Sequence, residues 1–246
     1  MNSRKTFFII FICALTMTGC DTQEQTTIDG GLTLKRATQT LDSIYANYSV
    51  SGICLLRENY PSNVGNYTAM YLASEEQKEI PNQYSYLWPY SGMFSAVNAL
   101  LSVTGDKSYK TLLDNKVLPG LEEYLDTSRN PTGYASYIST APQSDRFYDD
   151  NIWLGIDFLE TYRLTGNKKY LKQSEEIWKF LLSGNDDVLN GGIYWCEQKK
   201  ISKNTCSNAP ASVFALKMFK AKFLLILKQS NIILKTSILT KQRSNK

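Results

Sequence analysis

SDRFYDDNIWLGIDFLETYRLTGNKKYLKQSEEIWKFLL, residues 144–182, contains the pattern on which our prediction of the fold rests. Residues 149–164 are strongly apolar, which is typical of a helix that is buried on most of its sides. The Thr-Gly-Asn sequence at 165–167 ends this helix, because glycine readily adopts the left-handed conformation of a helix C-cap. Residues 168–182 then place charged and apolar side chains on opposite faces with helical period. The segment therefore predicts a hairpin of one buried and one half-exposed helix.

The same pattern occurs earlier in the chain and begins again later. TGDKSY at 104–109 and TGNKKY at 165–170 match in register at a distance of 61 residues. The first copy joins an apolar helix over 91–103 to an amphipathic helix over 107–125, and another apolar helix starts after Pro210. Helical hairpins that recur with such a period indicate an α/α toroid, in which inner helices form a ring and outer helices surround it. A generic helical bundle or solenoid is the alternative.

Two further segments belong to the predicted domain, which extends over 32–221. Residues 32–48 place apolar side chains along one face of a helix. Residues 190–195, Asn-Gly-Gly-Ile-Tyr-Trp, are typical of a turn and a short strand. Loops at one end of the inner helices surround the cavity of a toroid, so we expect the functional residues in these loops.

The composition excludes several kinds of chemistry. The 246 residues include 0 His, which excludes Ser-His-Asp and Cys-His catalysis and zinc sites with histidine ligands. Residues 1–197 hold 16 basic and 23 acidic side chains, whereas residues 198–246 hold 11 basic and no acidic ones. An acidic main body is not typical of a nucleic-acid-binding protein. Catalysis would have to rest on carboxylates, Tyr, Lys or Cys.

Residues 1–19 have the organisation of a secretory signal. Two basic residues precede the apolar segment 7–15, which is too short to span a bilayer. The ending TMTGC resembles a bacterial lipobox, in which Cys20 is lipidated and becomes the first residue of the mature protein; a plain signal peptide is the alternative. Residues 20–31 are predicted to be a polar tether. We expect an exported protein that is lipid-anchored to the bacterial outer membrane, at the cell surface or in the periplasm.

Three cysteines remain in the predicted domain. In an exported protein, Cys196 and Cys206 are able to form a disulfide across a short loop, which would leave Cys54 free. Three buried thiols are the alternative.

Asp149 and Asp150 open the predicted helix 149–164 and carry our hypothesis for the chemistry. A single aspartate often caps a helix N-terminus, so a capping role is the alternative. Adjacent side chains diverge by about 100° around a helix, and retaining glycosidases need a nucleophile and an acid/base about 5–5.5 Å apart. The helix N-terminus favours a charged carboxylate, whose charge raises the pKa of its neighbour. The pair therefore predicts one charged and one protonated carboxyl group.

Aromatic residues near the predicted loops favour a sugar substrate. The 16 Tyr outnumber the 10 Phe, and rings with a polar edge suit both the flat C–H faces and the hydroxyls of sugars. Trp153 and Trp178 lie inside predicted helices, and we interpret them as core residues. The other aromatic residues near these loops are Trp88, Tyr90, Tyr148, Tyr194 and Trp195.

Three strings resemble glycoside hydrolase family 76: YLWPYSGMFSAVNALLSVTGD at 86–106, SDRFYDDNIWLGIDFLE at 144–160 and GGIYWCEQKKISKNTCSNAP at 191–210. The likeness covers roughly residues 32–220, and the chain resembles the lipoproteins of mannan-degrading Bacteroidetes. The resemblance implies an all-α (α/α)6 toroid and a retaining, endo-acting attack on α-1,6-linked mannose backbones. It implies no metal and no other cofactor.

The resemblance also implies roles for individual residues. Asp149 is expected to attack the anomeric carbon, while Asp150 protonates the departing oxygen and afterwards activates water. The expected substrate is mannan or a manno-oligosaccharide, and transglycosylation by the same two aspartates is a close alternative. The resemblance implies sugar-binding roles for Tyr90, Trp195 and Asn208. The same role is expected for other residues near the predicted loops and beside the two aspartates: Trp88, Tyr148, Asn151 and Tyr194.

Metal chemistry is not expected elsewhere in the chain. Asp186 and Asp187 precede Asn190 and two glycines, which is typical of a turn rather than of a calcium site. Toroids that act on peptides or isoprenoids usually need metal ligands, and the absence of histidine disfavours that third class of function.

Residues 222–246 depart from the pattern. KFLLILKQSNIILKTSILTKQRSNK contains no acidic residue, glycine, tyrosine or tryptophan, although the resemblance predicts another Thr-Gly turn here. Three inner helices are predicted, whereas a complete toroid has six hairpins. Our hypothesis is that this tail is out of frame or degenerate and that about half of the toroid is missing; a basic amphipathic tail that contacts a membrane or a partner is the alternative. A truncated, non-catalytic mannan-binding or inactive remnant is therefore the alternative to an active glycosidase.

Overall fold

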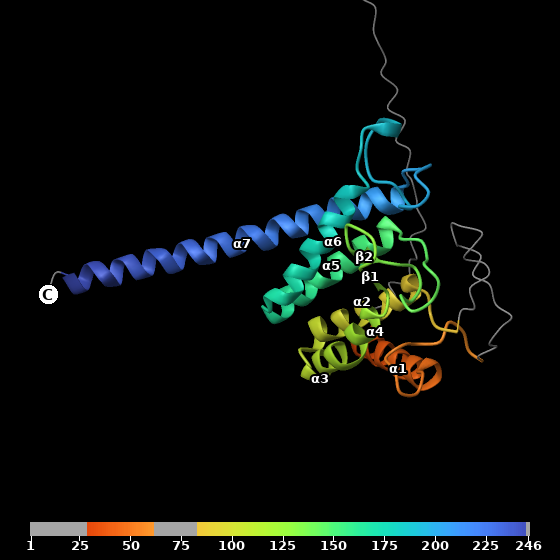
Figure 1. The fold of residues 1–246 in the computed structure, drawn as a ribbon. Coiled ribbons are helices and arrows are strands. Elements are labelled where there is room, and N and C mark those ends of the chain that lie inside the picture. The colour runs from red at the N-terminus through yellow and green to blue at the C-terminus, as the bar shows by residue number, and fades with distance from the viewer. Residues whose placement is uncertain (1–28, 62–82, 245–246) are drawn as a thin grey trace, which may run out of the picture.

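A computed structural model describes residues 29–61 and 83–244, and their side chains as far as Ile226 (Figure 1). The expected signal segment, the lipidation residue Cys20 and most of the expected tether lie outside these residues. Helix α1, Gly30–Tyr48, confirms the predicted helix but begins inside the expected tether. It begins there because the Asp29 carboxylate caps it, accepting hydrogen bonds from the first backbone N–H groups.

The two apolar helices of the predicted repeat are α2, Leu87–Thr104, and α5, Tyr148–Thr165. Both end in a glycine with left-handed backbone, Gly105 at φ 67° and Gly166 at φ 70°. The threonine before each glycine bonds back to the preceding turn of its own helix and also accepts from the residue after the glycine. The repeated Thr-Gly sequences at 104–105 and 165–166 therefore form the same C-terminal cap on both helices.

The helix that follows each turn lies outside its inner helix. Helix α6, Lys168–Ser183, confirms the second prediction and packs along α5. The single helix predicted over 107–125 is instead α3, Lys107–Leu112, a π-helical segment, Leu113–Val117, and α4, Leu118–Glu122. Pro119 lies at the start of α4 and has no N–H to continue the hydrogen bonds of a regular helix. A two-stranded sheet follows, in which β1, Leu125–Asp126, pairs antiparallel with β2, Gly133–Tyr134.

Helix α7, Thr205–Ser244, forms the third apolar helix. It starts six residues before the predicted start and contains Pro210, because Asn204 O accepts from the N–H groups of Ser207 and Asn208 and begins the helix earlier. Its N-terminal part packs along α5, and the rest extends away from the body of the molecule (Figure 1). Leu216 is 70% exposed and Phe219 68% exposed on the described part of this helix.

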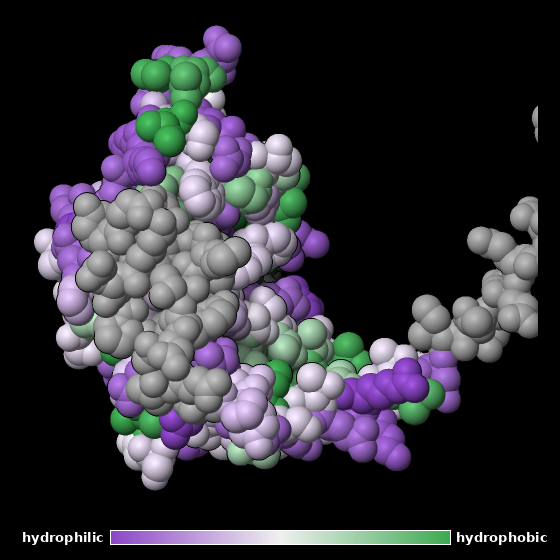
Figure 2. Space-filling view, turned by 90° about the vertical axis from the view of Figure 1, so that its right-hand side faces the viewer, coloured by the Kyte–Doolittle hydropathy of each residue, from purple (hydrophilic) through white to green (hydrophobic). Residues whose placement is uncertain are grey.

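The connection from α6 to α7 has the turn predicted within 190–195 but forms isolated bridges in place of the predicted short strand. It contains a 3-10 helix, Val188–Asn190, and two isolated bridges, Asn185 to Ile193 and Phe147 to Cys196. The second bridge places this connection beside the start of α5. Figure 2 shows a hydrophobic group at the top of the molecule, where Figure 1 places the 3-10 turn.

The inner helices α2 and α5 are parallel and aligned. Ser95 Oγ donates to Asp157 Oδ2 at 2.5 Å, Thr161 Oγ1 donates to Asn98 Oδ1 at 2.9 Å, and Arg163 Nη2 donates to Ser102 Oγ at 3.0 Å. The two residues of each pair are 61 to 63 positions apart, close to the 61-residue period of the repeat. Consecutive inner helices thus contact each other at equivalent depths, as in a ring. The described helices make part of an α/α toroid.

Among the described residues, no helix has the length and apolar character needed to cross a membrane.

Two glycines in the inner helices allow a matched test of this packing. A Cβ at Gly155 of α5 would overlap the ring of Phe214 of α7, which is fully buried against Trp178, whereas a Cβ at Gly92 of α2 has no atom within 4 Å. We expect Gly155→Ala to destabilise the protein by about 1–3 kcal/mol through overpacking. Gly92→Ala should stabilise it by about 1 kcal/mol through helix propensity. Urea unfolding of both variants measures the difference, and equal effects would contradict the α5–α7 packing.

The buried carboxyl group of Asp157 predicts a pH dependence of stability. Burial raises the pKa of Asp157 from 3.8 to about 6, despite hydrogen bonds from Ser95 and Asn98. The folded state therefore holds this proton more tightly than the unfolded state, and stability is lost as the pH rises from about 4 through about 6. The loss is roughly 3 kcal/mol for a shift of this size. We expect Asp157→Asn to lack this loss, so its advantage over the wild type in urea unfolding should grow between pH 4 and pH 7.

Candidate active site

Asp149 and Asp150 occupy the first turn of α5. The N-cap position belongs to Phe147, which makes no side-chain capping hydrogen bond, so neither aspartate caps the helix. Asp149 is half-buried, and Asp150 is only 8% exposed. A capping role therefore does not account for this pair, and the buried position of two carboxyl groups needs another explanation.

Both aspartates line a cavity of about 380 Å³. The cavity lies at the N-terminal ends of α2 and α5, where the fold predicts a functional site. Trp88 and Trp195, two of the predicted sugar-binding residues, also line it. Trp88 and Asp149 are 61 residues apart and so hold equivalent positions at the starts of successive inner helices. The remaining lining residues are Tyr86, Ser136 and Phe147.

A cavity of similar size, about 390 Å³, lies between the C-terminal half of α5 and α7. Its lining includes one acidic side chain, Glu160, which is ion-paired with Arg163. The paired carboxyl groups needed for acid/base chemistry are therefore in the cavity at the N-terminal ends of the helices.

The two carboxyl groups differ in their readiness to ionise. Burial, followed by the charge of Asp149, raises the pKa of Asp150 well above its ordinary value. Burial also raises the pKa of Asp149, but interactions with the Cys206 thiol, with backbone N–H groups of the first turn and with the Trp195 indole oppose that rise. Asp149 is therefore the first of the pair to lose its proton. The backbone N–H groups at the helix N-terminus lower the pKa of Asp149, as expected, but burial raises this pKa by more.

Trp195 connects the cavity wall to Asp149. Its indole Nε1 donates a hydrogen bond to Asp149 Oδ2 at 3.2 Å. Its ring packs against Phe147 with centroids 4.9 Å apart, and Tyr148 N donates to the Trp195 carbonyl. The ring and the backbone of Trp195 are thus both tied to the residues around the start of α5.

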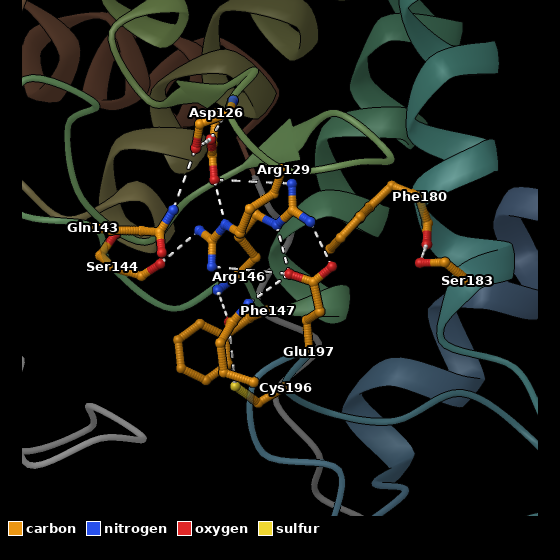
Figure 3. Close-up of polar contacts among 12 residues, drawn as sticks. Asp126, Arg129, Gln143, Ser144, Arg146, Phe147, Phe180, Ser183, Cys196 and Glu197 are labelled. Atoms are coloured by element: carbon orange, nitrogen blue, oxygen red, sulfur yellow. Dashed lines mark hydrogen bonds and ion pairs between the residues drawn. The ribbon is translucent and has the colours of Figure 1, made fainter.

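A buried arginine holds the loops around the start of α5 (Figure 3). Arg146 is fully buried, and its guanidinium donates two hydrogen bonds to the carboxylate of Glu197, with Nε to Oε2 at 2.7 Å. It also donates to the Pro131 carbonyl at 2.9 Å and lies 3.9 Å from the Asp126 carboxylate. Its guanidinium stacks over the Phe180 ring of α6 at 4.8 Å. One side chain thus joins the segment before α5 to the β1–β2 loop, to α6 and to the loop that carries Trp195.

Two predicted sugar-binding tyrosines lie away from the cavity. Tyr90 is buried, and its hydroxyl donates to the carbonyl oxygens of Cys54 and Val117. Tyr148 points to the other side of α5 and stacks on Phe180 with centroids 4.8 Å apart. Both tyrosines pack in the core, in contrast to the sugar-binding roles expected for them.

The two predicted sugar-binding amides are also structural. Asn151 Oδ1 accepts from Tyr134 N at 2.8 Å, and its Nδ2 donates to Tyr134 O at 2.9 Å, so this side chain joins α5 to β2. Asn208 forms the same pair of bonds with the backbone of Ile193 and joins α7 to the preceding loop. Each amide is saturated by backbone groups and has no free hydrogen-bonding edge for a sugar.

Tyr194 belongs to a clamp within the loop before α7. The buried ammonium of Lys203 lies 4.5 Å from the centroid of its ring, and the same ammonium donates to Asp186 Oδ1 at 2.7 Å and to Val188 O at 2.6 Å. Tyr194 is buried by this arrangement, in contrast to the sugar-binding role expected for it. The Asp186 carboxylate also accepts from Val188 N, as in the turn that the sequence predicts.

Other residues also differ from the predictions. Trp153, interpreted as a core residue, is 41% exposed, whereas Trp178 packs edge-on against Phe214 in the core. The three described cysteines are free, and Cys206, exposed beside Asp149, is not paired with the buried Cys196. Tyr86, Ser136 and Phe147 line the cavity but were not predicted as site residues. The sequence offered little indication of a role for these residues, because only the folded chain brings Tyr86 and Ser136 to the start of α5.

The hydrogen bond from Trp195 predicts a change in the ionisation of Asp149. Trp195→Phe removes a donor that favours the charged form, so the pKa of Asp149 should rise. A pH titration of the Asp149 carboxyl carbon by NMR measures this change. Trp178→Phe is the matched control, because Trp178 lies in the core against Phe214 and should leave the titration unchanged. An unchanged pKa in Trp195→Phe would show that this hydrogen bond has no influence on the carboxylate.

Comparison with known proteins places this site in a family. The model of Glycosyl hydrolase family 76 matches residues 58–222. A family 76 glycoside hydrolase (mannosidase) from Bacteroides thetaiotaomicron VPI-5482 is 26% identical, with a TM-score of 0.64 over 76% of this chain and 48% of that one. An inactive variant of the α-1,6-mannanase of Salegentibacter sp. HEL1_6, in which two consecutive aspartates are replaced by asparagine, is 26% identical with a TM-score of 0.54, over 76% of this chain and 45% of that one.

The chain thus spans about half of the length of these solved structures. No curated protein is significantly similar to it. The family match covers most of the chain and includes both aspartates, their cavity and the repeated hairpin. The chain belongs to glycoside hydrolase family 76.

Proposed function

We propose that the protein is a glycosidase that cleaves α-1,6-mannosidic bonds in mannan backbones by a retaining mechanism with Asp149 and Asp150. The observation that carries this proposal is the unequal pair of carboxyl groups at the start of α5. Asp149 loses its proton before Asp150, whose pKa burial raises well above its ordinary value, and both lie within one cavity lined by Trp88 and Trp195. A retaining glycosidase needs one carboxylate and one carboxylic acid in this relation.

In the first step, an Asp149 oxygen forms a bond to the anomeric carbon as the bond to the departing sugar oxygen breaks. Asp150 transfers its proton to that oxygen, so the leaving sugar departs as a neutral alcohol. In the second step, Asp150, now charged, takes a proton from water while the water oxygen displaces Asp149. The anomeric configuration is retained because each of the two displacement steps inverts the anomeric carbon. A sugar hydroxyl in place of water would give transglycosylation.

The residues around Asp149 suit a nucleophile. The indole of Trp195 holds Asp149 Oδ2, and Trp195 is in turn fixed by Phe147 and by the backbone of Tyr148. An oriented carboxylate loses little conformational freedom when it reacts. Trp88 and Trp195, which both line the cavity, provide flat apolar surfaces for the C–H faces of a sugar.

The relatives support the same substrate and the same residues. The Salegentibacter protein is described as an α-1,6-mannanase, and its variant with two consecutive aspartates replaced is described as inactive and in complex with α-1,6-mannotriose. We infer that Asp149 and Asp150 are the corresponding pair in this chain. Lipidation at Cys20 would hold such an enzyme at the outer membrane, and mass spectrometry of the membrane fraction tests that placement.

The second candidate is a mannan-binding protein without turnover. The large exposed side chains of Leu216 and Phe219 on α7 favour it, because an inner helix of a closed toroid has neighbours on both sides. In this case the two aspartates and the two tryptophans of the cavity would hold a sugar without completing its cleavage.

Asparagine substitutions test the two catalytic roles separately. With unbranched α-1,6-mannan, the wild type should release short oligosaccharides, and Asp150→Asn should lower the rate by about 10²–10⁴-fold because the leaving oxygen is no longer protonated. With an aryl α-mannoside whose leaving group needs no proton, Asp150→Asn should regain a burst of aryl alcohol. Asp149→Asn should give no burst, because no covalent intermediate is able to form. Oligosaccharide analysis and stopped-flow absorbance measure these outcomes.

Asp42→Asn is the matched control, since Asp42 is exposed on α1, far along the chain from the pair. Retention of mannan by the wild type without any product would support the binding protein instead. A burst in Asp149→Asn with none in Asp150→Asn would reverse the two roles.

A further inference from the structure

The catalytic cavity and the Ser95–Asp157 hydrogen bond use the same two faces of the same two helices. Ser95 follows Trp88 by seven residues on α2, and Asp157 follows Asp150 by seven residues on α5. Seven residues are about two helical turns, so each residue returns to the same face about 10 Å further along the axis. Trp88 and Asp150, which line the cavity, and Ser95 and Asp157, which form the hydrogen bond, therefore hold equivalent positions on the two helices at two depths.

Polar side chains determine how α2 and α5 align. Ser95 Oγ donates to Asp157 Oδ2 at 2.5 Å, and Asn98 Nδ2 donates to the Asp157 carbonyl at 3.0 Å. Thr161 Oγ1 donates to Asn98 Oδ1 at 2.9 Å, and the side chains of Asn98 and Thr161 are almost completely buried. Ser95 itself is exposed, so the buried part of this network consists of Asn98, Asp157 and Thr161. Apolar side chains such as Phe94 and Phe158 pack well over a range of offsets, whereas these buried hydrogen bonds are satisfied at one offset only.

The carboxyl group of Asp157 is not there for stability. Its burial lowers the stability of the fold at neutral pH, where an uncharged side chain would avoid the loss of solvation. Residues that lower stability recur at sites where activity needs a particular arrangement. Asp157 lies within the protein and does not line the catalytic cavity, so its function must act through another residue.

We propose that Asp157 is a positioning residue whose hydrogen bond with Ser95 sets the width of the catalytic cavity between Trp88 and Asp150. This inference rests on the proposed function for the identity of the sugar. A sugar ring must contact Trp88 while its anomeric carbon stays in reach of Asp149, so a slide or rotation of α2 against α5 would break one of these contacts. Displacements near 1 Å at a catalytic site lower rates by about 100-fold.

A positional role differs from a role of the charge. Asp157 is influenced by Glu160 on its own helix and by Lys217 on α7, as well as by its hydrogen-bond donors on α2. Asp157→Asn removes the charge but keeps an acceptor oxygen at the same distance. Asp157→Glu keeps the charge but lengthens the side chain by one methylene group, which pushes α2 away from α5. The two substitutions therefore separate geometry from charge.

Fluorine NMR of 5-fluorotryptophan protein tests the proposal without a sugar. The chain has 4 Trp, so each resonance is assigned by one Trp→Phe substitution. We expect Ser95→Ala and Asp157→Glu to shift the Trp88 resonance and to leave Trp178 unchanged. Ser95→Thr and Asp157→Asn should keep the wild-type Trp88 resonance. Ser102→Ala is the matched control, because Ser102 bonds to Arg163 of α5 at the far, exposed end of the same interface.

Calorimetric titration with α-1,6-mannotriose gives the functional measurement on the same proteins. Ser95→Ala and Asp157→Glu should weaken binding by about tenfold or more, whereas Asp157→Asn and Ser102→Ala should bind as the wild type does. A wild-type Trp88 resonance in Asp157→Glu, or an equal shift in Ser102→Ala, would overturn the proposal. If the wild type binds no mannotriose, the proposed function fails, and the Trp88 resonances still decide whether Asp157 positions α2.

Discussion

The buried ion pair of Arg146 with Glu197 is the interaction on which the site depends. A guanidinium without contact to water needs its charge compensated inside the protein, and Glu197 and Asp126 supply that compensation (Figure 3). Because these partners come from different loops, satisfying one charge fixes several segments at once. Arg146 lies three residues before Asp149, and Glu197 lies two residues after Trp195. Asp149 and the residue that donates a hydrogen bond to it, Trp195, thus lie close in sequence to the two partners of one ion pair.

Neighbouring aspartates acquire different properties from small differences in their surroundings. Asp150 is deeply buried and next to a charge, while Asp149 receives hydrogen bonds from the first turn of α5 and from Trp195. The burial of each carboxyl group lowers the stability of the folded protein at neutral pH, since burial raises its pKa above the value in the unfolded chain, whereas the hydrogen bonds to Asp149 offset part of that loss. Asp157 adds to that loss in the same helix. Helix α5 therefore carries a concentration of unfavourable burial that the surrounding core must offset.

The sequence predicted those features for which a local pattern of residues is compatible with only one structure. A Thr-Gly turn with a capping residue after it ends an inner helix in only one way, so the bounds of α5 and α6 and the end of α2 were predicted to within one residue, whereas α2 begins four residues before its predicted start. The paired aspartates were predicted for a similar reason, because two adjacent acids before an apolar helix have few structural uses. Tyr90 and Asn208 were misassigned, since a tyrosine hydroxyl or an amide near a loop bonds equally well to a backbone group or to a sugar. Nor does the sequence reveal that Asn204 O starts α7 before Pro210.

The exposed Leu216 and Phe219 on α7 have a consequence for the life of the protein in a cell. Large apolar side chains on an accessible helix are the features by which chaperones and quality-control proteases recognise their clients. The steady amount of the protein would then depend on how quickly that helix is covered after synthesis, as much as on the rate of synthesis.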